Sequence, residues 1–403
     1  MIHPRWLTII GIGEDGLDGL SSAAKTLLVQ AELVVGGARH LALAGPLACE
    51  TLVWPSPLSA AFPLIAARQG RPVVVLATGD PFFYGIGSLL SDEFLASEMR
   101  CLPGTSAFSL AAARLGWALQ ECSMLSLHGR DLALVVPHLQ PGARILALSW
   151  DGTTPGKLAH LLLARGMGLS RLIVMQAMGG ARERLVSFDA GACPEAGFDP
   201  LNLVALEVRG EPDAQFIPLT SGIADDLFEH DGQITKREIR AMTLSALAPL
   251  RGQLLWDIGA GSGSIGIEWM LRSQHNRAIA IEPRADRAAR IARNAAALGV
   301  PGLQIVQGEA PGALAGLPAP DAIFLGGGAS DSGVMTAAWA ALRPGGRLVA
   351  NAVTLETQTL LMQGFQQHGG DLVQVQISRA DPVGPYFGWR PAMPVMQWAV
   401  VKP

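Results

Sequence analysis

The chain has 403 residues, more than one hydrophobic core usually supports, so we expect two or more domains. Apolar residues make up 49% of it and charged residues only 16%, with 47 Gly and 27 Pro, which is typical of compact α/β domains and argues against disorder. The formal net charge of −4 gives no general attraction to nucleic acid or to an anionic membrane surface, so we expect neither partner.

The chain contains four cysteines, Cys49, Cys101, Cys122 and Cys193. They form no C-x-x-C pair and no Cys/His ligand spacing, so we expect neither disulfides nor a metal site. No segment approaches the ~18 apolar residues of a membrane span. The first residues, MIHPRWLTIIGIGEDG, lack a small-residue cleavage site and are interpreted as a first strand. We therefore expect a cytoplasmic protein.

Short apolar runs alternate with amphipathic stretches along the whole chain, the pattern of parallel sheets covered by helices. In the first half we predict strands at 6–13, 31–37, 71–80, 144–150, 171–179 and 201–208, and helices at 21–30, 105–117 and 154–166. The pattern then breaks into a polar stretch without clean periodicity. We predict a first domain over residues 1–210, a linker over 211–233 and a second domain over 234–403.

The second domain has its own series of elements. We predict helices at 234–249, 264–273, 285–299 and 334–342, and strands at 254–260, 278–283, 303–308, 321–328 and 346–353, with two later strands near 373–380 and 394–401. The series opens on a glycine-rich elbow, LLWDIGAGSGSIGIEWM (254–270). No sequence repeat relates the two halves, which indicates a fusion of two different α/β domains.

The glycines of the elbow allow a tight strand-to-helix turn and a close approach of a ligand to the backbone. They also satisfy the dinucleotide pattern G-x-G-x-x-G, so NAD remains an alternative. Asp257, at the end of the strand, would attract an ammonium group and repel a pyrophosphate. Glu282 suits a ribose diol with either cofactor, and Glu309 suits an adenine amino group. An acid-lined pocket favours S-adenosylmethionine, which carries a sulfonium and an ammonium.

Three segments, ITKREIRA (234–241), the elbow and DAIFLGGG (321–328), together resemble the decarboxylating methyltransferase domain of cobalamin biosynthesis that acts at C-15 of the corrin precursor. The resemblance implies that the cofactor site is lined by Thr235, Gly259, Ala260, Gly261, Ser262, Gly263, Glu282 and Ala310. Thr235 would also suit the N-cap of the helix that follows, and both roles can hold together.

The strand that ends in Gly326, Gly327 and Gly328 lacks the polar N/D-P-P-Y signature common in amide-nitrogen methyltransferases. Glycines there leave room for a bulky planar ligand and supply no catalytic base, which fits methylation at a nucleophilic ring carbon. Asn351, with Thr354 and Glu356, follows the next strand. These side chains suit substrate contacts, and ordinary loop capping is at least as good an interpretation for each.

The first half also begins with a G-x-G-x-x-G stretch, but Glu14, Asp15 and Asp18 crowd that loop with negative charge, which disfavours a phosphate. Three further segments, ATGDPFFYGIG (77–87), CLPGTSAFSLAAARLGW (101–117) and LSLHGRD (125–131), resemble the tetrapyrrole methylase fold, and within it the branch that methylates C-5 of the same precursor.

That resemblance implies a methyl donor bound in the cleft between two α/β lobes, contacted by Gly79, Asp80, Pro81, Thr105 and Ser106. Asp80 could instead be a turn residue, and the two hydroxyls could cap a helix. His128 and Arg130 would bind a substrate carboxylate or, as an alternative, belong to an ordinary surface loop. The sequence does not identify a catalytic acid or base, and none is assigned.

The fold expected is therefore α/β, a two-lobed tetrapyrrole methylase domain followed by a Rossmann-like class I methyltransferase domain. The order of the two resemblances is similar to a bifunctional family that methylates precorrin-6B at C-5 and C-15 and decarboxylates its C-12 acetate, giving precorrin-8X. It implies two S-adenosylmethionine sites per chain, a tetrapyrrole substrate and a homo-oligomer. A cobalt-containing substrate, and a module that binds S-adenosylmethionine or a tetrapyrrole without turnover, stay open as alternatives.

Overall fold

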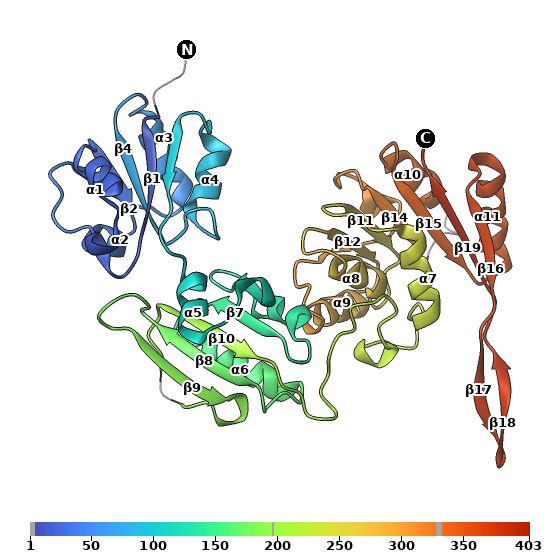
Figure 1. The fold of residues 1–403 in the computed structure, drawn as a ribbon. Coiled ribbons are helices and arrows are strands. Elements are labelled where there is room, and N and C mark those ends of the chain that lie inside the picture. Colours follow the sequence, from blue (N-terminus) through green and yellow to red (C-terminus); the bar gives the residue numbers. More distant parts are fainter. Residues whose placement is uncertain (1–4, 196, 328–332) are drawn as a thin grey trace. The chain divides into compact units, whose positions relative to one another are not determined.

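The computed structural model describes residues 5–195, 197–327 and 333–403, and the chain folds into two compact units (Figure 1). One unit consists of Met1–Leu132 and His138–Phe216, and the other of Ala133–Pro137 and Ile217–Pro403. Most of the segment expected as a linker, residues 211–233, thus belongs to the second unit. Its apolar side chains Ile217, Ile223 and Phe228 are buried, which fixes the segment on that unit.

The first unit begins with a parallel five-stranded sheet in the order β3-β2-β4-β1-β5. Its strands are β1 (Leu7–Ile12), β2 (Leu33–Gly36), β3 (Glu50–Val53), β4 (Val73–Thr78) and β5 (Met99–Leu102), and its helices are α1 (Ser22–Val29), α2 (Ala38–Leu43), α3 (Phe62–Ala66) and α4 (Ile86–Glu93). Strand β1 is buried at every position because apolar clusters cover both faces of the sheet.

A second sheet of the same unit has the order β6-β7-β10-β8-β9. Its strands are β6 (Cys122–Ser126), β7 (Arg144–Leu148), β8 (Arg171–Gln176), β9 (Arg184–Asp189) and β10 (Asn202–Glu207), and helices α5 (Ala107–Leu115) and α6 (Thr154–Ala164) pack on it. Only β6 and β7 pair in parallel; the other three pairs are antiparallel. The expectation of a parallel sheet was wrong here, because a continuous apolar run reports burial of both faces and not strand direction.

The second unit is built on a seven-stranded sheet in the order β13-β12-β11-β14-β15-β19-β16. Its strands are β11 (Leu254–Ile258), β12 (Arg277–Glu282), β13 (Gln304–Gln307), β14 (Ala322–Leu325), β15 (Arg347–Ala352), β16 (Asp371–Val375) and β19 (Val395–Val401), and its helices are α7 (Arg237–Leu247), α8 (Ser264–Leu271), α9 (Ala285–Ala297), α10 (Val334–Ala341) and α11 (Leu355–His368). The first five strands are parallel, and β19 runs antiparallel to both of its neighbours. The strand order reverses direction between β11 and β14, which is where open α/β sheets bind ligands.

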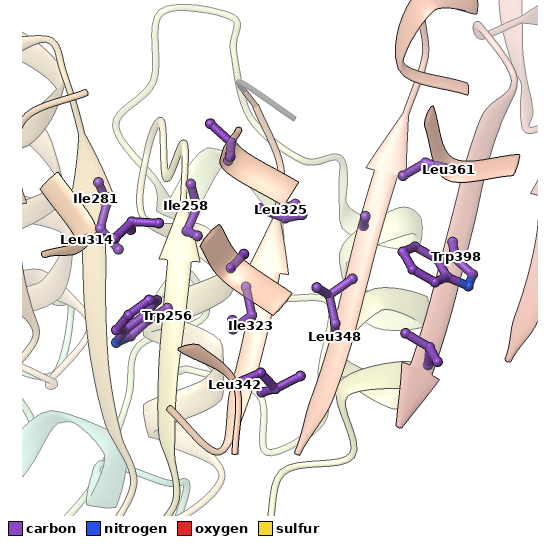
Figure 2. Packing of buried hydrophobic residues seen from close by; sticks show 14 of the residues in the cluster. Trp256, Ile258, Ile281, Leu314, Ile323, Leu325, Leu342, Leu348, Leu361 and Trp398 are labelled. Atoms are coloured by element: carbon purple, nitrogen blue, oxygen red, sulfur yellow. The ribbon is translucent and has the colours of Figure 1, made fainter. Parts of the chain in front are cut away.

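One face of this sheet carries the main core of the second unit (Figure 2). Trp256 and Ile258 of β11 and Trp398 of β19 are at most 1% exposed within it. Because side chains alternate along a strand, Asp257 points to the opposite face. The sheet therefore places an acidic side chain on the face that α8 covers.

Two features of the second unit depart from the sequence analysis. Helix α11 follows β15, in a stretch for which the sequence analysis predicted no helix or strand. The single strand expected near 373–380 is divided between β16 and a separate hairpin of β17 (Ser378–Val383) and β18 (Tyr386–Pro391), which projects from the sheet in Figure 1. Among the helices that the structure describes, none is both long and apolar enough to cross a membrane.

Candidate active sites

The elbow between β11 and α8 depends on glycine at several positions. Gly259, Gly261 and Gly263 all have positive φ, at 71°, 60° and 76°. A Cβ at Gly259 would lie 2.5 Å from the carbonyl oxygen of Gly327, so the ends of β11 and β14 touch through their backbones. The short contact and the positive φ together explain why position 259 is glycine.

Glu282, at the end of β12, is hydrogen-bonded to the elbow. Its Oε2 accepts a hydrogen bond from the Gly261 amide at 2.8 Å, and its Oε1 accepts one from the Arg284 amide at 3.2 Å. The side chain is only 3% exposed. A carboxylate held by two backbone amides keeps a fixed position, here at the carboxyl edge of the sheet.

Asp257 lies beneath the elbow and is 1% exposed. Its Oδ2 accepts a hydrogen bond from the Gly266 amide at 3.0 Å, whereas its Oδ1 has no partner among the described residues. Burial, and then the charge of Glu282, raise the pKa of Asp257 to about 7, against the opposing effect of the Gly266 hydrogen bond. Near neutral pH this carboxyl is therefore divided between its protonated and ionised forms.

A cavity of about 690 Å³ opens at the carboxyl edge of this sheet. The expected residues that line it are Thr235, Gly259, Ala260, Gly261, Gly326, Gly327 and Asn351. The remaining ones, Asp257, Ser262, Gly263, Glu282, Glu309 and Ala310, are not among its lining residues. Gly328 lies outside the described residues. The structure thus brings the T-K-R-E segment, the elbow, the glycine strand end and the end of β15 together around one space.

The residues outside the lining have other surroundings. Ser262 is buried, its Oγ has no hydrogen-bond partner within the described part of the chain, and Gly263 is the N-cap of α8. Ala310 packs against the main core, and Glu309 is exposed. Their contacts to a cofactor stay predictions.

Sequence reasoning missed several residues of the cavity wall. They come from the segment before α7, from α9 and from the base of the hairpin, and include Gln233, Ile234, Lys236, Arg287, Val375, Ile377, Arg379 and Met393. Lys236 and Arg379 are cations in that wall, and Arg379 forms an ion pair with Glu238 of α7. The T-K-R-E segment was used to predict a role for Thr235 and not for Lys236, and nothing in the sequence indicated that the hairpin base with Arg379 lines the same cavity.

Helix α7 begins at Arg237 with Lys236 as its N-cap, and the Lys236 side chain makes no capping hydrogen bond. The alternative role of Thr235 as an N-cap was therefore wrong. Its carbonyl oxygen instead accepts a hydrogen bond from the Arg240 guanidinium. Arg240 is 0% exposed, as is Glu268, and its Nε lies 2.5 Å from the Glu268 Oε1. Glu268 also accepts from the Gly222 and Ile223 amides at 2.7 and 2.9 Å, so one buried ion pair holds the segment that leads to Thr235.

The end of β15 carries two of the expected substrate residues in different roles. Asn351 lines the cavity and donates a hydrogen bond to Thr243 of α7 at 2.8 Å. Thr354 caps α11, accepting a hydrogen bond from the Thr357 amide at 3.4 Å, and Glu356 is exposed in the first turn of that helix. The capping interpretation thus holds for Thr354, although it also lines the cavity.

In the first unit, three strand ends converge through glycines. A Cβ at Gly11, in β1, would lie 1.8 Å from the carbonyl oxygen of Gly79 and 2.3 Å from the amide nitrogen of Gly104. The Gly104 amide donates to that same carbonyl at 2.9 Å. This packing places the G-D-P loop directly against the P-G-T-S segment.

The side chains of these two segments have local partners. Asp80 accepts a hydrogen bond from the Phe82 amide at 2.9 Å, which is a turn-forming contact, and Pro81 is buried. Ser106 caps α5 by accepting from the Ser109 amide at 3.1 Å. Thr105 is exposed. The turn and cap interpretations therefore hold for Asp80 and Ser106, and their contacts to a cofactor stay predictions.

The H-G-R-D loop lies against the G-D-P-F-F-Y-G loop. The guanidinium carbon of Arg130 stands 5.3 Å from the ring centroid of Tyr84, and the Tyr84 hydroxyl donates to the Met124 carbonyl at 3.0 Å. His128 is exposed. Tyr84 was not singled out from the sequence, although it adopts positive φ (58°), which is rare for a bulky residue.

A polar cluster surrounds Thr78, the last residue of β4 before the G-D-P loop. Arg39 donates to Glu14, and to the Thr78 hydroxyl at 2.8 Å. Glu14 also pairs with Arg182, which precedes β9 of the second sheet, at 3.5 Å. His40 contacts the Thr78 hydroxyl at 2.8 Å, and burial together with Arg39 lowers the pKa of His40 to about 4. The acidic loop after β1 is thus partly neutralised by two arginines, which sequence spacing did not reveal.

Comparison with known proteins gives a family for each half. Residues 6–193 match the family model of tetrapyrrole (corrin/porphyrin) methylases, and residues 226–402 match that of the precorrin methyltransferase domain. A curated precorrin-6Y C(5,15)-methyltransferase [decarboxylating] from Sinorhizobium sp is 56% identical over 98% of this chain and 96% of its own length. The same enzyme from Mycobacterium tuberculosis (strain CDC 1551 / Oshkosh) is 40% identical over 98% of this chain and all of its own. The chain belongs to the precorrin-6Y C5,15-methyltransferase (decarboxylating) family.

The crystal structure of the C-terminal domain of precorrin-6Y C5,15-methyltransferase from Rhodobacter capsulatus is 49% identical and covers 46% of this chain and all of that one, with a TM-score of 0.44. Membership of the family makes the chain a methyltransferase and implies S-adenosylmethionine as its methyl donor. The second unit fits such a group, because Gly259 and Gly261 present a wall without Cβ atoms to the cavity and Glu282 stands at the end of the next strand. Among the described residues, no cluster of three or more His, Cys, Asp or Glu is arranged to hold a metal ion.

Proposed function

We propose that this chain methylates precorrin-6B at C-5 and at C-15 and removes the carboxyl group of the C-12 acetate, giving precorrin-8X. The first unit would perform the C-5 methylation. The second unit would perform the C-15 methylation and the decarboxylation. Each unit would bind its own S-adenosylmethionine.

The observation that carries this proposal is the cavity at the carboxyl edge of the second sheet. Its lining combines the elbow with Gly326 and Gly327, and it includes the cations Lys236 and Arg379. A surface without side chains suits a planar ring, and cations suit the carboxylates at the periphery of a tetrapyrrole. The Lys236 ammonium lies 3.9 Å from the Asp225 carboxylate, and Arg240 lies closer to that carboxylate, at 3.0 Å. The positive charge of Lys236 is therefore only weakly neutralised.

The chemistry asks for positioning more than for a protein base. S-adenosylmethionine supplies an electrophilic methyl group on its sulfonium. An enamine-like meso carbon of the reduced tetrapyrrole would provide the electron pair for the new carbon–carbon bond, while the methyl–sulfur bond breaks and its electron pair stays on the departing thioether. At C-5 the ring would then lose the proton of that carbon to water. When the acetate loses carbon dioxide, the electron pair of the broken bond passes into the protonated conjugated macrocycle. The cavity residues would hold the ring close to the methyl donor in the reacting orientation, which lowers the entropic part of the barrier.

The experiment is turnover with the purified chain, precorrin-6B and excess S-adenosylmethionine, followed by mass spectrometry. The proposal expects a product that has gained two methylene masses and lost one carbon dioxide. Titration with S-adenosylhomocysteine should give two sites per chain. Binding of S-adenosylhomocysteine without any change in the macrocycle would favour a non-catalytic binding module, or a cobalt-containing substrate, which the same assay tests next.

A further inference from the structure

Three buried or half-buried polar side chains meet behind the cavity of the second unit. Asn351 of β15 and Gln397 of β19 are cross-strand partners, and Thr243 of α7 packs over both. Thr243 is 0% exposed and Gln397 is 7% exposed. Of the three, Asn351 alone is among the residues that line the cavity. The arrangement is thus a polar network with one member at the cavity wall.

The hydrogen bonds of Thr243 decide the orientation of the other two. Its hydroxyl has one proton, which it donates to the Ile239 carbonyl at 2.8 Å. It can therefore only accept further hydrogen bonds, and it does so from Asn351 Nδ2 at 2.8 Å and from Gln397 Nε2 at 3.1 Å. Both of its lone pairs are then in use.

Asn351 is thereby held in one of its two amide orientations. Its Nδ2 must face Thr243, and its Oδ1 accepts a hydrogen bond from Gln397 Nε2 at 2.9 Å. A flipped Asn351 amide would set its Nδ2 against the Gln397 Nε2, donor to donor, and its Oδ1 against the Thr243 hydroxyl oxygen, acceptor to acceptor. One N–H of Asn351 remains uncommitted by these bonds.

We infer that Thr243 and Gln397 are positioning residues that fix the Asn351 amide so that its remaining N–H donates to a carboxylate of the bound tetrapyrrole. This inference rests on the proposed function of the second unit and deepens it. The neutral donor complements Lys236 and Arg379 in the same cavity wall. An amide set in advance loses little freedom on binding, so the network would act on the affinity for the tetrapyrrole and not on that for the methyl donor.

The test compares Thr243→Val with Thr243→Ser in the full chain. Valine keeps the shape of threonine but removes the acceptor, whereas serine keeps it. We expect Thr243→Val to raise the KM for the tetrapyrrole about tenfold in the C-15 methylation, the effect of losing one hydrogen bond to a charged group. By the same reasoning Thr243→Ser should stay within about twofold of the wild type, and the KM for S-adenosylmethionine should stay within about twofold in both.

A second variant guards against a merely structural effect. Gln397→Met removes the other contact that orients Asn351 and should raise the same KM, while C-5 methylation by the same molecules stays unchanged. Equal KM values for the tetrapyrrole in Thr243→Val and Thr243→Ser would overturn the inference. So would a variant in which the KM for the tetrapyrrole and the KM for S-adenosylmethionine rise together while the Tm falls. If the wild type showed no turnover, the proposed function would fail. In that case the positioning would still be tested by measuring the affinity of Thr243→Val and Thr243→Ser for the tetrapyrrole from its change in absorbance on binding.

Discussion

Arg240 and Glu268 form an ion pair in which neither side chain is exposed, with Nε and Oε1 2.5 Å apart. The pair joins α7 to α8, and further hydrogen bonds connect it to backbone groups of residues 222, 223 and 235. It therefore ties the entry of the second unit to the helix that follows the elbow. Thr235, a cavity residue, is held to it by its carbonyl oxygen.

Replacing Arg240 by methionine should strongly destabilise the second unit, because Glu268 would remain as a buried charge without its partner. We expect a loss of about 3–5 kcal/mol. Native-state hydrogen exchange of the β11 and β12 amides measures the free energy of opening of this unit. The matched control is the double variant Arg240→Met/Glu268→Gln, in which the charge of both partners is gone and the single side-chain oxygen of the glutamine still accepts from one of the Gly222 and Ile223 amides. Equal losses in the single and double variants would contradict the account.

Gly259→Ala should abolish binding at the second site alone. A methyl group there would meet the Gly327 carbonyl at 2.5 Å, on a backbone with φ of 71°. Titration with S-adenosylhomocysteine should then fall from two sites per chain to one. Gly312→Ala is the matched control in the same unit, because a methyl group added there would meet nothing within 4 Å and its φ is not positive. Two intact sites in Gly259→Ala would contradict the role of the elbow.

The stability of the cofactor-free chain should carry a pH signature from Asp257. Burial and the charge of Glu282 raise the pKa of Asp257 from its ordinary value of 3.8 to about 7. The folded state then binds this proton more tightly than the unfolded state does. The resulting stabilisation is complete below about pH 4 and is lost as the pH rises through about 7.

Asp257→Asn keeps an acceptor for the Gly266 amide and removes the titration. Relative to the wild type, its free energy of unfolding in urea should therefore rise steadily between about pH 4 and pH 7 and level off above that. A difference between the two proteins that stays constant across this range would show that the buried carboxyl has an ordinary pKa.

Arg130→Ala should weaken binding of the tetrapyrrole to the first unit, because the guanidinium beside Tyr84 would offer a positive charge to a peripheral carboxylate. We expect the KM for the tetrapyrrole in C-5 methylation to rise about tenfold, as for one lost charged hydrogen bond. C-15 methylation should not change. Arg100→Ala, at an exposed position of β5, serves as the control for a general loss of positive charge. A shift of the same size in both variants would count against a specific contact.

The sequence was sufficient to predict those parts of the cavity that are formed by the backbone at the ends of strands. The glycines at 259, 261, 326 and 327 are adjacent in the structure because parallel strands bring their carboxyl ends to one edge, and a pattern of strands and helices shows which ends these are. The same reasoning placed Asn351 at this edge, whereas Thr235 was taken from the family resemblance, and both line the cavity.

It failed where a contact depends on pairing between distant segments. Nothing local to Arg379 or Met393 indicates that the hairpin base closes the cavity wall. The antiparallel pairing of β8 with β10 could not be predicted either, since both strands are buried at nearly every position and their sequences carry no signal of strand direction. Asp257 was recognised as a key acid. Its nearly complete burial could not be predicted, because it depends on how α8 packs on the sheet and not on the sequence of the strand alone.

The most direct test of the central claim, one methylation in each unit, is the product mass formed from precorrin-6B by Asp80→Asn and by Glu282→Gln. The account predicts that Asp80→Asn gives a product with one methylene gained and one carbon dioxide lost, because only C-5 methylation fails. Glu282→Gln should lose the C-15 methylation and keep that at C-5. Loss of both methylations from either single change would contradict the division of the two reactions between the two units.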